Sequence, residues 1–335
     1  MSDSPDLSNR TLFGIQNDAV RYTWAAYNLF ILMSSLIGDS IIIIASIKYN
    51  AIKLHKIIVV IIRHIAVCDL TVALVTVFPR SVSLLANDWV FGNTLKYFAA
   101  YGIYYFNAVS LLLICAMTTS KLIIMKYPFE ARFLSEQTGQ LICASLWVVS
   151  LCIILIPVII DRHDIIFDHR TYDCRIRFSA DIYRWLKPVV IGLFTLLPNI
   201  LVIVTTIHLL IIAQGFARRG KESLKWQGVI TTILVAAVYC ISILPYTIYS
   251  FIGYSRAAFA DDPHSFFRTH YNRIVKSFIF LNIISNFYIY SMTVASFREF
   301  LLSRMQLLKI SKPSIKSSTV IVRRYNSISE PVSEL

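Results

Sequence analysis

Two carboxylic acids lie inside long apolar segments of this sequence. Asp39 belongs to the segment Tyr22–Ile47, and Asp69 belongs to a segment from about Ile57 to Val82. An ionisable side chain within a lipid bilayer is costly, so such residues are functional candidates by default. Two carboxylates at close range in a low dielectric cannot both ionise cheaply, so one can stay protonated and donate a hydrogen bond to the other. We therefore expect the two acids to form a coupled pair.

The residue patterns of common enzymes are missing from the sequence. It contains no Gly-rich phosphate loop and no Cys-x-x-Cys pair. The histidines do not form a metal site within the apolar segments; they are His55, His64, His163, His169, His208, His264 and His270. We expect no catalytic residues and a protein that is not an enzyme.

The composition favours an integral membrane protein. The chain has 335 residues, of which 56% are hydrophobic and 15% are charged, a balance that would leave a soluble protein with more apolar surface than it could bury. The net charge is +13. A nucleic-acid partner is not expected, because no basic face survives between the apolar segments. The excess charge is better explained by lipids of the inner leaflet and by a cytoplasmic partner.

Seven apolar segments are long enough to cross a membrane. The third, Tyr97–Ser120, carries no charged side chain, and at about 1.5 Å per residue its roughly 36 Å of helix crosses a hydrocarbon core of about 30 Å. The other segments are Tyr22–Ile47, Ile57–Val82, Thr138–Ile160, Lys187–Gln214, Trp226–Tyr254 and Tyr271–Thr293. The sequence therefore predicts an all-α, seven-transmembrane helix bundle.

The two ends of the chain are polar. Residues 1–21 are expected to be an extracellular tail, with Asn9 as a glycosylation acceptor in Asn9-Arg-Thr11 and no cleavable signal peptide. The transmembrane domain is expected over residues 22–308, where apolar residues recur at helical spacing from Phe297 to Leu308 and predict a short amphipathic eighth helix. Residues 309–335 are expected to form a disordered cytoplasmic tail. Lys and Arg are slightly more numerous on the side of the apolar segments that carries the C-terminal tail, and this weak bias agrees with a cytoplasmic tail.

Several motifs, in this order along the chain, resemble those of rhodopsin-like (class A) G-protein-coupled receptors. The run Ile65-Ala-Val-Cys-Asp-Leu70 is close to the family's Leu-Ala-x-x-Asp-Leu, and Trp89-Val-Phe-Gly92 matches its Trp-x-Phe-Gly turn. Asn286-Phe-Tyr-Ile-Tyr290 resembles Asn-Pro-x-x-Tyr, with Phe287 in place of the proline. Further family positions are kept by Trp147, Pro157, Pro198 and Pro245. This resemblance covers about Tyr22 to Leu308.

The resemblance implies a sodium site in the middle of the bundle. In the family, the acid that matches Asp69 forms this site with a small hydroxyl on the third helix and asparagines on the seventh. The matching residues are Ser110, Asn282 and Asn286, and such oxygen ligands suit a hard cation. The alternative is a purely structural polar network, satisfied by hydrogen bonds alone.

The inner switch departs from the family pattern. Ser120-Lys121-Leu122 stands in the place of Asp-Arg-Tyr, and a lysine makes a point charge where the family's arginine offers a planar fork. The sixth-helix position that often supplies an acidic partner holds Lys225. Repulsion between Lys121 and Lys225 should favour the open form, in which the inner ends of the third and sixth helices are apart, and so raise basal activity. Asn286 and Tyr290 complete the switch that the resemblance implies.

The resemblance also places a ligand site at the outer end of the bundle. The family's amine receptors have an acid where this chain has Ile103, and the retinal-bearing lysine of opsins is replaced by Phe280. Two cations, Arg80 and Lys276, with aromatic side chains deeper in the site suit a carboxylate or other anion, such as a peptide terminus. The candidate ligand-binding residues are Arg80, Ile103, Tyr104, Asn107, Tyr246, Thr247 and Lys276. The alternative is local pairing, Arg80 with Asp88 and Lys276 with an acid of an outer loop.

The family usually bridges its second outer loop to a cysteine at the outer end of the third helix. Cys174 falls in that loop, but the matching helix position is Lys96, so we expect no such bridge.

The function that the resemblance implies is ligand binding outside the plasma membrane, with the N-terminus outside, and activation of a heterotrimeric G protein inside. A non-signalling receptor-like binder is an alternative. A transporter is a further alternative, which should show internal repeats or broken helices lining a polar path.

Overall fold

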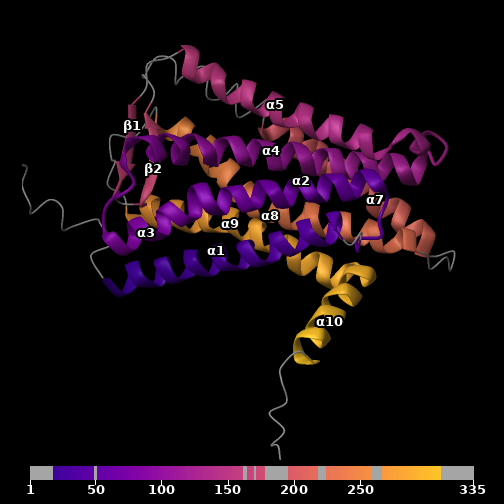
Figure 1. Ribbon diagram of the computed structural model, residues 1–335. Helices are drawn as coiled ribbons and strands as arrows, with labels where there is room; N and C mark the ends of the chain where they lie inside the picture. Colours follow the sequence, from indigo (N-terminus) through magenta and orange to yellow (C-terminus); the bar gives the residue numbers. More distant parts are fainter. Residues whose placement is uncertain are drawn as a thin grey trace, which may run out of the picture.

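The computed structural model describes residues 18–48, 51–160, 164–169, 171–177, 195–217, 224–257 and 266–310. These residues form an elongated helical bundle (Figure 1). Its α-helices are α1 (Asp18–Ile47), α2 (Lys56–Val72), α3 (Phe78–Ala86), α4 (Gly92–Lys126), α5 (Glu136–Ile160), α7 (Leu197–Ala217), α8 (Leu224–Ala257), α9 (Phe266–Thr293) and α10 (Ala295–Ile310). In Figure 1, α1, α2, α4 and α5 lie lengthwise beside one another, with α8 and α9 packed together behind them.

Six described helical segments are long and apolar enough to cross a membrane. They are Asp18–Ile47, Lys56–Ala86, Gly92–Lys126, Glu136–Ile156, Leu197–Gly215 and Gly228–Ile248. A seventh meets the same measure only when Ser277–Thr293 is joined to Ala295–Gln306, from which it is bent by 94°. This bend carries α10 out of the bundle (Figure 1), as a surface helix requires. The predicted seven-helix bundle with a short eighth helix is confirmed.

The second span is one predicted helix that the structure divides into three parts. Between α2 and α3 lies η2 (Ala73–Val77), a π-helical stretch, and Pro79 stands in the first turn of α3. Proline has no N–H and its ring collides with the carbonyl four residues earlier in an α-helix. A wider π-helical turn just before Pro79 relieves this collision while the chain continues across the membrane.

An antiparallel hairpin of β1 (Asp164–Asp168) and β2 (Asp173–Arg177) lies at one end of the bundle, beside α3 and the start of α4 (Figure 1). An outer loop that contains Cys174 was expected here, and strands were not predicted. Cys174 on β2 is buried in an apolar cluster with Ala99 and Ala100 of α4, with Trp89 and Phe167 packed against it. Packing therefore holds the hairpin on α4, where Lys96 takes the place of the family's cysteine.

The helix boundaries differ slightly from those predicted. α1 begins at Asp18, four residues before the predicted start, and Asp18 pairs with Arg21 at 2.9 Å within its first turn. An acid there also interacts favourably with the helix dipole. α10 ends at Ile310, two residues beyond the predicted end. Asn9, the start predicted for the fifth span at Lys187 and residues 311–335 of the predicted C-terminal tail lie outside the described residues.

Candidate functional site

A buried polar centre lies between α2 and α9 in the middle of the bundle. Asp69 is 2% exposed, and Asn286 Nδ2 donates a hydrogen bond of 2.7 Å to its Oδ2. Among the oxygens of the described residues that are buried without a hydrogen-bond partner are those of the three other residues predicted for the sodium site: Ser110 Oγ, Asn282 Oδ1 and Asn286 Oδ1. Buried oxygens without donors are uncommon and call for an explanation. These residue types and their burial fit a cation held by oxygen ligands.

Asp39 of α1 belongs to the same centre and interacts with Asp69, but without the predicted hydrogen bond between the two acids. Its Oδ2 accepts a hydrogen bond of 2.5 Å from Ser35 one turn earlier, and Oδ1 has no hydrogen-bond partner among the described residues. Asp39 is close enough to act electrostatically on Asp69. The predicted hydrogen bond between the two carboxyl groups is wrong, because Oδ2 of Asp39 accepts from Ser35 and Oδ2 of Asp69 accepts from Asn286.

Tyr290 also faces this centre. Its ring is fully buried, its hydroxyl has no hydrogen-bond partner among the described residues, and both Asp39 and Asp69 act on it electrostatically. The sequence analysis placed Tyr290 only in the inner switch. The structure therefore adds a hydroxyl to the polar groups around the two acids.

At the inner end, Lys121 is held against the backbone of α8. The residue is 5% exposed, and a Cβ added to Gly228 would lie 2.6 Å from its Nζ. The described residues give Lys121 no hydrogen bond and no ion pair. Ser120 beside it is also buried, at 6% exposure. The side chain of Lys225, three residues before Gly228, lies outside the described part of the chain.

His55 lies in the inner loop before α2 and is affected by the same lysine. Burial, and then the positive charge of Lys121, lower the pKa of His55 below its ordinary value of 6.5. Its Nδ1 is buried without a hydrogen-bond partner among the described residues. The inner end thus gathers a lysine and a histidine that disfavour one another's positive charge.

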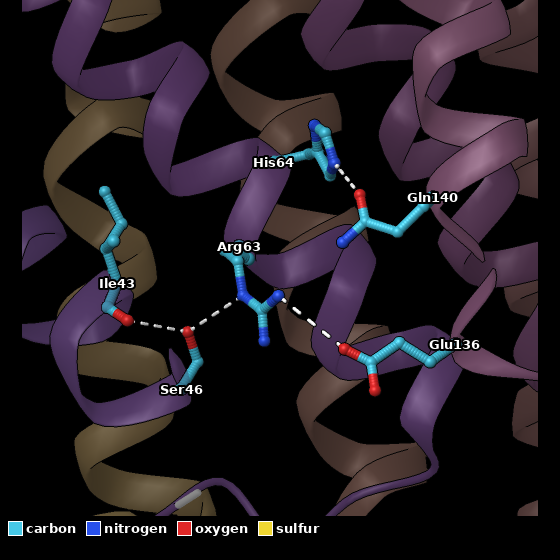
Figure 2. Close-up of polar contacts among 6 residues, drawn as sticks. All are labelled: Ile43, Ser46, Arg63, His64, Glu136 and Gln140. Carbon is cyan, nitrogen blue, oxygen red and sulfur yellow. Dashed lines mark hydrogen bonds and ion pairs between the residues drawn. The ribbon is translucent and has the colours of Figure 1, made fainter. Parts of the chain in front are cut away.

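A second polar network ties α1, α2 and α5 together near the inner ends of these helices (Figure 2). Arg63 lies between Ser46 and Glu136, with Nε 3.4 Å from Ser46 Oγ and Nη1 3.8 Å from Glu136 Oε1. His64 Nε2 is 2.9 Å from Gln140 Oε1. The sequence analysis missed this network. Its only signal was the presence of polar side chains near the inner ends of three apolar segments.

The contacts of His64 fix its neutral tautomer. Trp147 Nε1 donates to His64 Nδ1 over 3.2 Å. An indole nitrogen is a donor only, so Nδ1 must be the acceptor and the proton lies on Nε2, which donates to Gln140. His64 therefore links Trp147 and Gln140 of α5 to α2 through one oriented ring.

At the outer end, Arg80 is paired with the hairpin. Arg80 is 5% exposed, its Nε is 3.4 Å from Asp173 Oδ1 of β2, and its guanidinium carbon is 5.4 Å from the ring centre of Phe280. The alternative pairing with Asp88 is wrong. Asp88 instead accepts from the backbone N–H of Trp89 at 2.7 Å and lies 3.9 Å from His169.

The other predicted ligand residues differ in exposure. Ile103, Asn107 and Tyr246 are partly buried, whereas Thr247 is buried and donates its hydroxyl hydrogen to the Ile243 carbonyl over 3.1 Å. Tyr104 is 42% exposed on the surface of the bundle. The side chain of Lys276 lies outside the described residues. The structure therefore brings Arg80 together with the hairpin.

Comparison with known proteins gives the family. The model of the 7 transmembrane receptor (rhodopsin family) matches residues 38–290. The D(5)-like dopamine receptor of Takifugu rubripes is 28% identical over 134 residues, 40% of this chain and 28% of the relative. The D(1C) dopamine receptor of Xenopus laevis is 27% identical over 134 residues, with the same coverage of each chain. The D(1)-like dopamine receptor of Oreochromis mossambicus is 28% identical over 166 residues, 48% of this chain and 40% of the relative.

The matched region thus spans less than half the length of these curated relatives. The family match itself is broader, running from Gly38 in α1 to Tyr290 near the end of α9. The described helices, long and apolar enough to cross a membrane, agree with it. The chain belongs to the rhodopsin family of seven-transmembrane receptors and is a multi-pass membrane protein.

Proposed function

We propose that this chain is a plasma-membrane receptor that binds an extracellular ligand and activates a heterotrimeric G protein. Its N-terminus lies outside, so the hairpin end of the bundle faces the ligand and the Lys121 end faces the cytoplasm. The single observation that carries the proposal is the hydrogen bond between Asp69 and Asn286, because it joins α2 and α9 inside the bundle between the two ends. A buried polar contact of this kind has discrete arrangements that a ligand can shift.

The ligand is proposed to be an anion or a peptide. The matched relatives are named as dopamine receptors, and dopamine is an amine. The resemblance to amine receptors, however, puts Ile103 where their acid stands. Arg80 and Lys276 offer N–H donors at this end instead, which favours a ligand with a carboxylate or carbonyl acceptor over one with an ammonium group.

The polar centre is proposed to hold a sodium ion. The ligands would be Asp69, Ser110, Asn282 and Asn286, whose buried oxygens without donors support the assignment. When bound, the ion would supply a positive charge that offsets the buried carboxylate. Release of the ion would leave the Asp69 carboxylate buried without a positive partner. This would lower the stability of the bundle, because an unpaired buried carboxylate is costly.

The inner end is proposed to favour the open form. Lys121 has no ion-pair partner among the described residues, and α8, whose first turn contains Lys225, brings Gly228 against the Lys121 amine. Separating α8 from α4 would give this amine water and remove its proximity to other cations. Raised basal signalling is the expected consequence.

The test is basal signalling of the full chain in cells that carry a panel of G-protein reporters. We expect wild type to signal above cells without the receptor, and Lys121→Asp to lower that signal by pairing with Lys225. Lys126→Asp on the same helix is the matched control and should leave the signal unchanged. Silence on every reporter, with surface expression intact, would favour the non-signalling binder. Equal signals from wild type and Lys121→Asp would refute the like-charge explanation of basal signalling. They would not contradict the proposal that the chain activates a G protein.

A further inference from the structure

The guanidinium of Arg80 is buried but not fully satisfied. Arginine offers five N–H donors, and among the described residues both Nε and Nη1 of Arg80 are buried without a hydrogen-bond partner. Asp173 balances the charge from 3.4 Å. Its oxygen does not lie along the N–H direction, however, so the contact is an ion pair and not a hydrogen bond. Arg80 therefore keeps donors that require an acceptor.

The surroundings of Arg80 restrict what this acceptor can be. Phe280 of α9 covers one face of the guanidinium, with 5.4 Å to the ring centre. Tyr27 of α1 acts electrostatically on Arg80, and its hydroxyl hydrogen is already donated to the Ser277 carbonyl over 3.0 Å. Arg80 and Asp173 are 5% and 8% exposed. The site is thus an apolar and aromatic environment around one ion pair whose net charge is zero.

We propose that Arg80 binds the carbonyl oxygen of an uncharged, amide-bearing ligand such as a peptide backbone. A carboxylate brought to the free donors would lie close to the carboxylate of Asp173, and an ammonium group would lie close to the guanidinium. Like charges at such range in a low dielectric repel strongly. A neutral carbonyl accepts the N–H groups without adding charge. The inference rests on the proposed function for the location of the ligand, and it selects the amide among the proposed ligand classes.

Asp173 is then a specificity-determining residue. Its carboxylate already balances the positive charge of Arg80, as an anionic ligand would otherwise do. The same carboxylate repels an anion that approaches Arg80 and so selects against anionic ligands. Replacing Asp173 with an uncharged residue of the same shape leaves the Arg80 charge without a partner. The preference of the site should then change from amide to carboxylate.

The test uses thermal unfolding of the purified full chain in detergent with acetamide, sodium acetate or methylammonium chloride as probes, at constant ionic strength. For wild type we expect acetamide to raise Tm and the other two to have no effect. For Asp173→Asn we expect acetate to raise Tm more than acetamide, with the ratio of their half-saturating concentrations changed by about tenfold or more. Asp88→Asn, at an acid of this end that does not pair with Arg80, should behave like wild type.

Removal of the arginine is the second arm. Arg80→Met can fail to fold because it leaves Asp173 buried and unpaired, so Arg80→Met/Asp173→Leu removes both charges. Neither acetamide nor acetate should stabilise this double variant. The proposal is overturned if acetate stabilises wild type as well as acetamide does. It is also overturned if acetamide acts equally on the double variant, or if Asp173→Asn keeps the wild-type preference. Because these readouts need no G protein, a failure of signalling is distinguished from a failure of this site.

Discussion

Gly38 of α1 lies directly against Phe287 of α9, so that a Cβ added to Gly38 would be 2.9 Å from the Cβ of Phe287 and 3.0 Å from its Cγ. The Cβ of Phe287 is fixed to its backbone, so it cannot move aside unless α9 moves. Phe287 replaces the family's proline, and the glycine opposite provides the space that the larger side chain needs.

Gly38→Ala should therefore lower stability. Overpacking of this kind costs about 1–3 kcal/mol, and a fall in Tm of the purified receptor measures it. Gly215→Ala on α7 is the matched control, because nothing lies within 4 Å of a Cβ there; it should be neutral or stabilise by up to about 1 kcal/mol. Phe287→Ala should reduce the effect of Gly38→Ala only in part, because it removes the Cγ contact and keeps the Cβ contact. Equal Tm values for the two alanine variants would contradict the close approach.

The contact of Trp147 with His64 should contribute measurably to stability. Trp147→Phe removes the indole donor and leaves His64 Nδ1 without it, which should lower stability by about 0.5–1.5 kcal/mol beyond any packing loss. A double-mutant cycle with His64→Leu isolates this term from the packing loss. A coupling energy near zero would show that the hydrogen bond has no net effect.

The proposed sodium site predicts a cation-dependent Tm. Replacing sodium chloride with choline chloride should lower the Tm of wild type, since an ion present at about ten times its Kd adds about 1.4 kcal/mol. Asp69→Asn should abolish this difference. Asp88→Asn is the control and should keep it, because Asp88 contacts Trp89 and His169 and not the proposed ligand set. Sodium dependence that survives Asp69→Asn would exclude the site.

His55 should make stability depend on pH. Its lowered pKa, caused by burial and then by Lys121, means that the folded chain binds a proton less readily than the unfolded chain. Stability should be unaffected by His55 above about pH 6.5 and should fall as the pH drops from there toward the lower folded pKa. The difference in Tm between wild type and His55→Gln, followed across this range, measures the effect. A difference independent of pH would contradict it.

Much of the bundle could be predicted because it depends on local sequence. Long apolar segments must form helices in a membrane, and the resemblance placed Asp69 beside Asn286, which the structure joins by a hydrogen bond. The partner of Arg80 could not be predicted. Asp88 and Asp173 are both acids of the outer loops, and the choice between them depends on the hairpin, which forms through contacts distant in sequence. The fit of Gly38 to Phe287 likewise depends on two helices far apart in the chain.

The π-helical stretch Ala73–Val77 has a consequence for the outer end of the receptor. Each residue of an α-helix advances the chain by about 100° around the helix axis, so deletion of one residue from this five-residue stretch would remove the π-helical turn and rotate everything beyond it. Arg80 would then be carried around the helix, away from Asp173 and Phe280. The charge balance at the hairpin end of the bundle therefore depends on the length of a segment that contains no charged side chain.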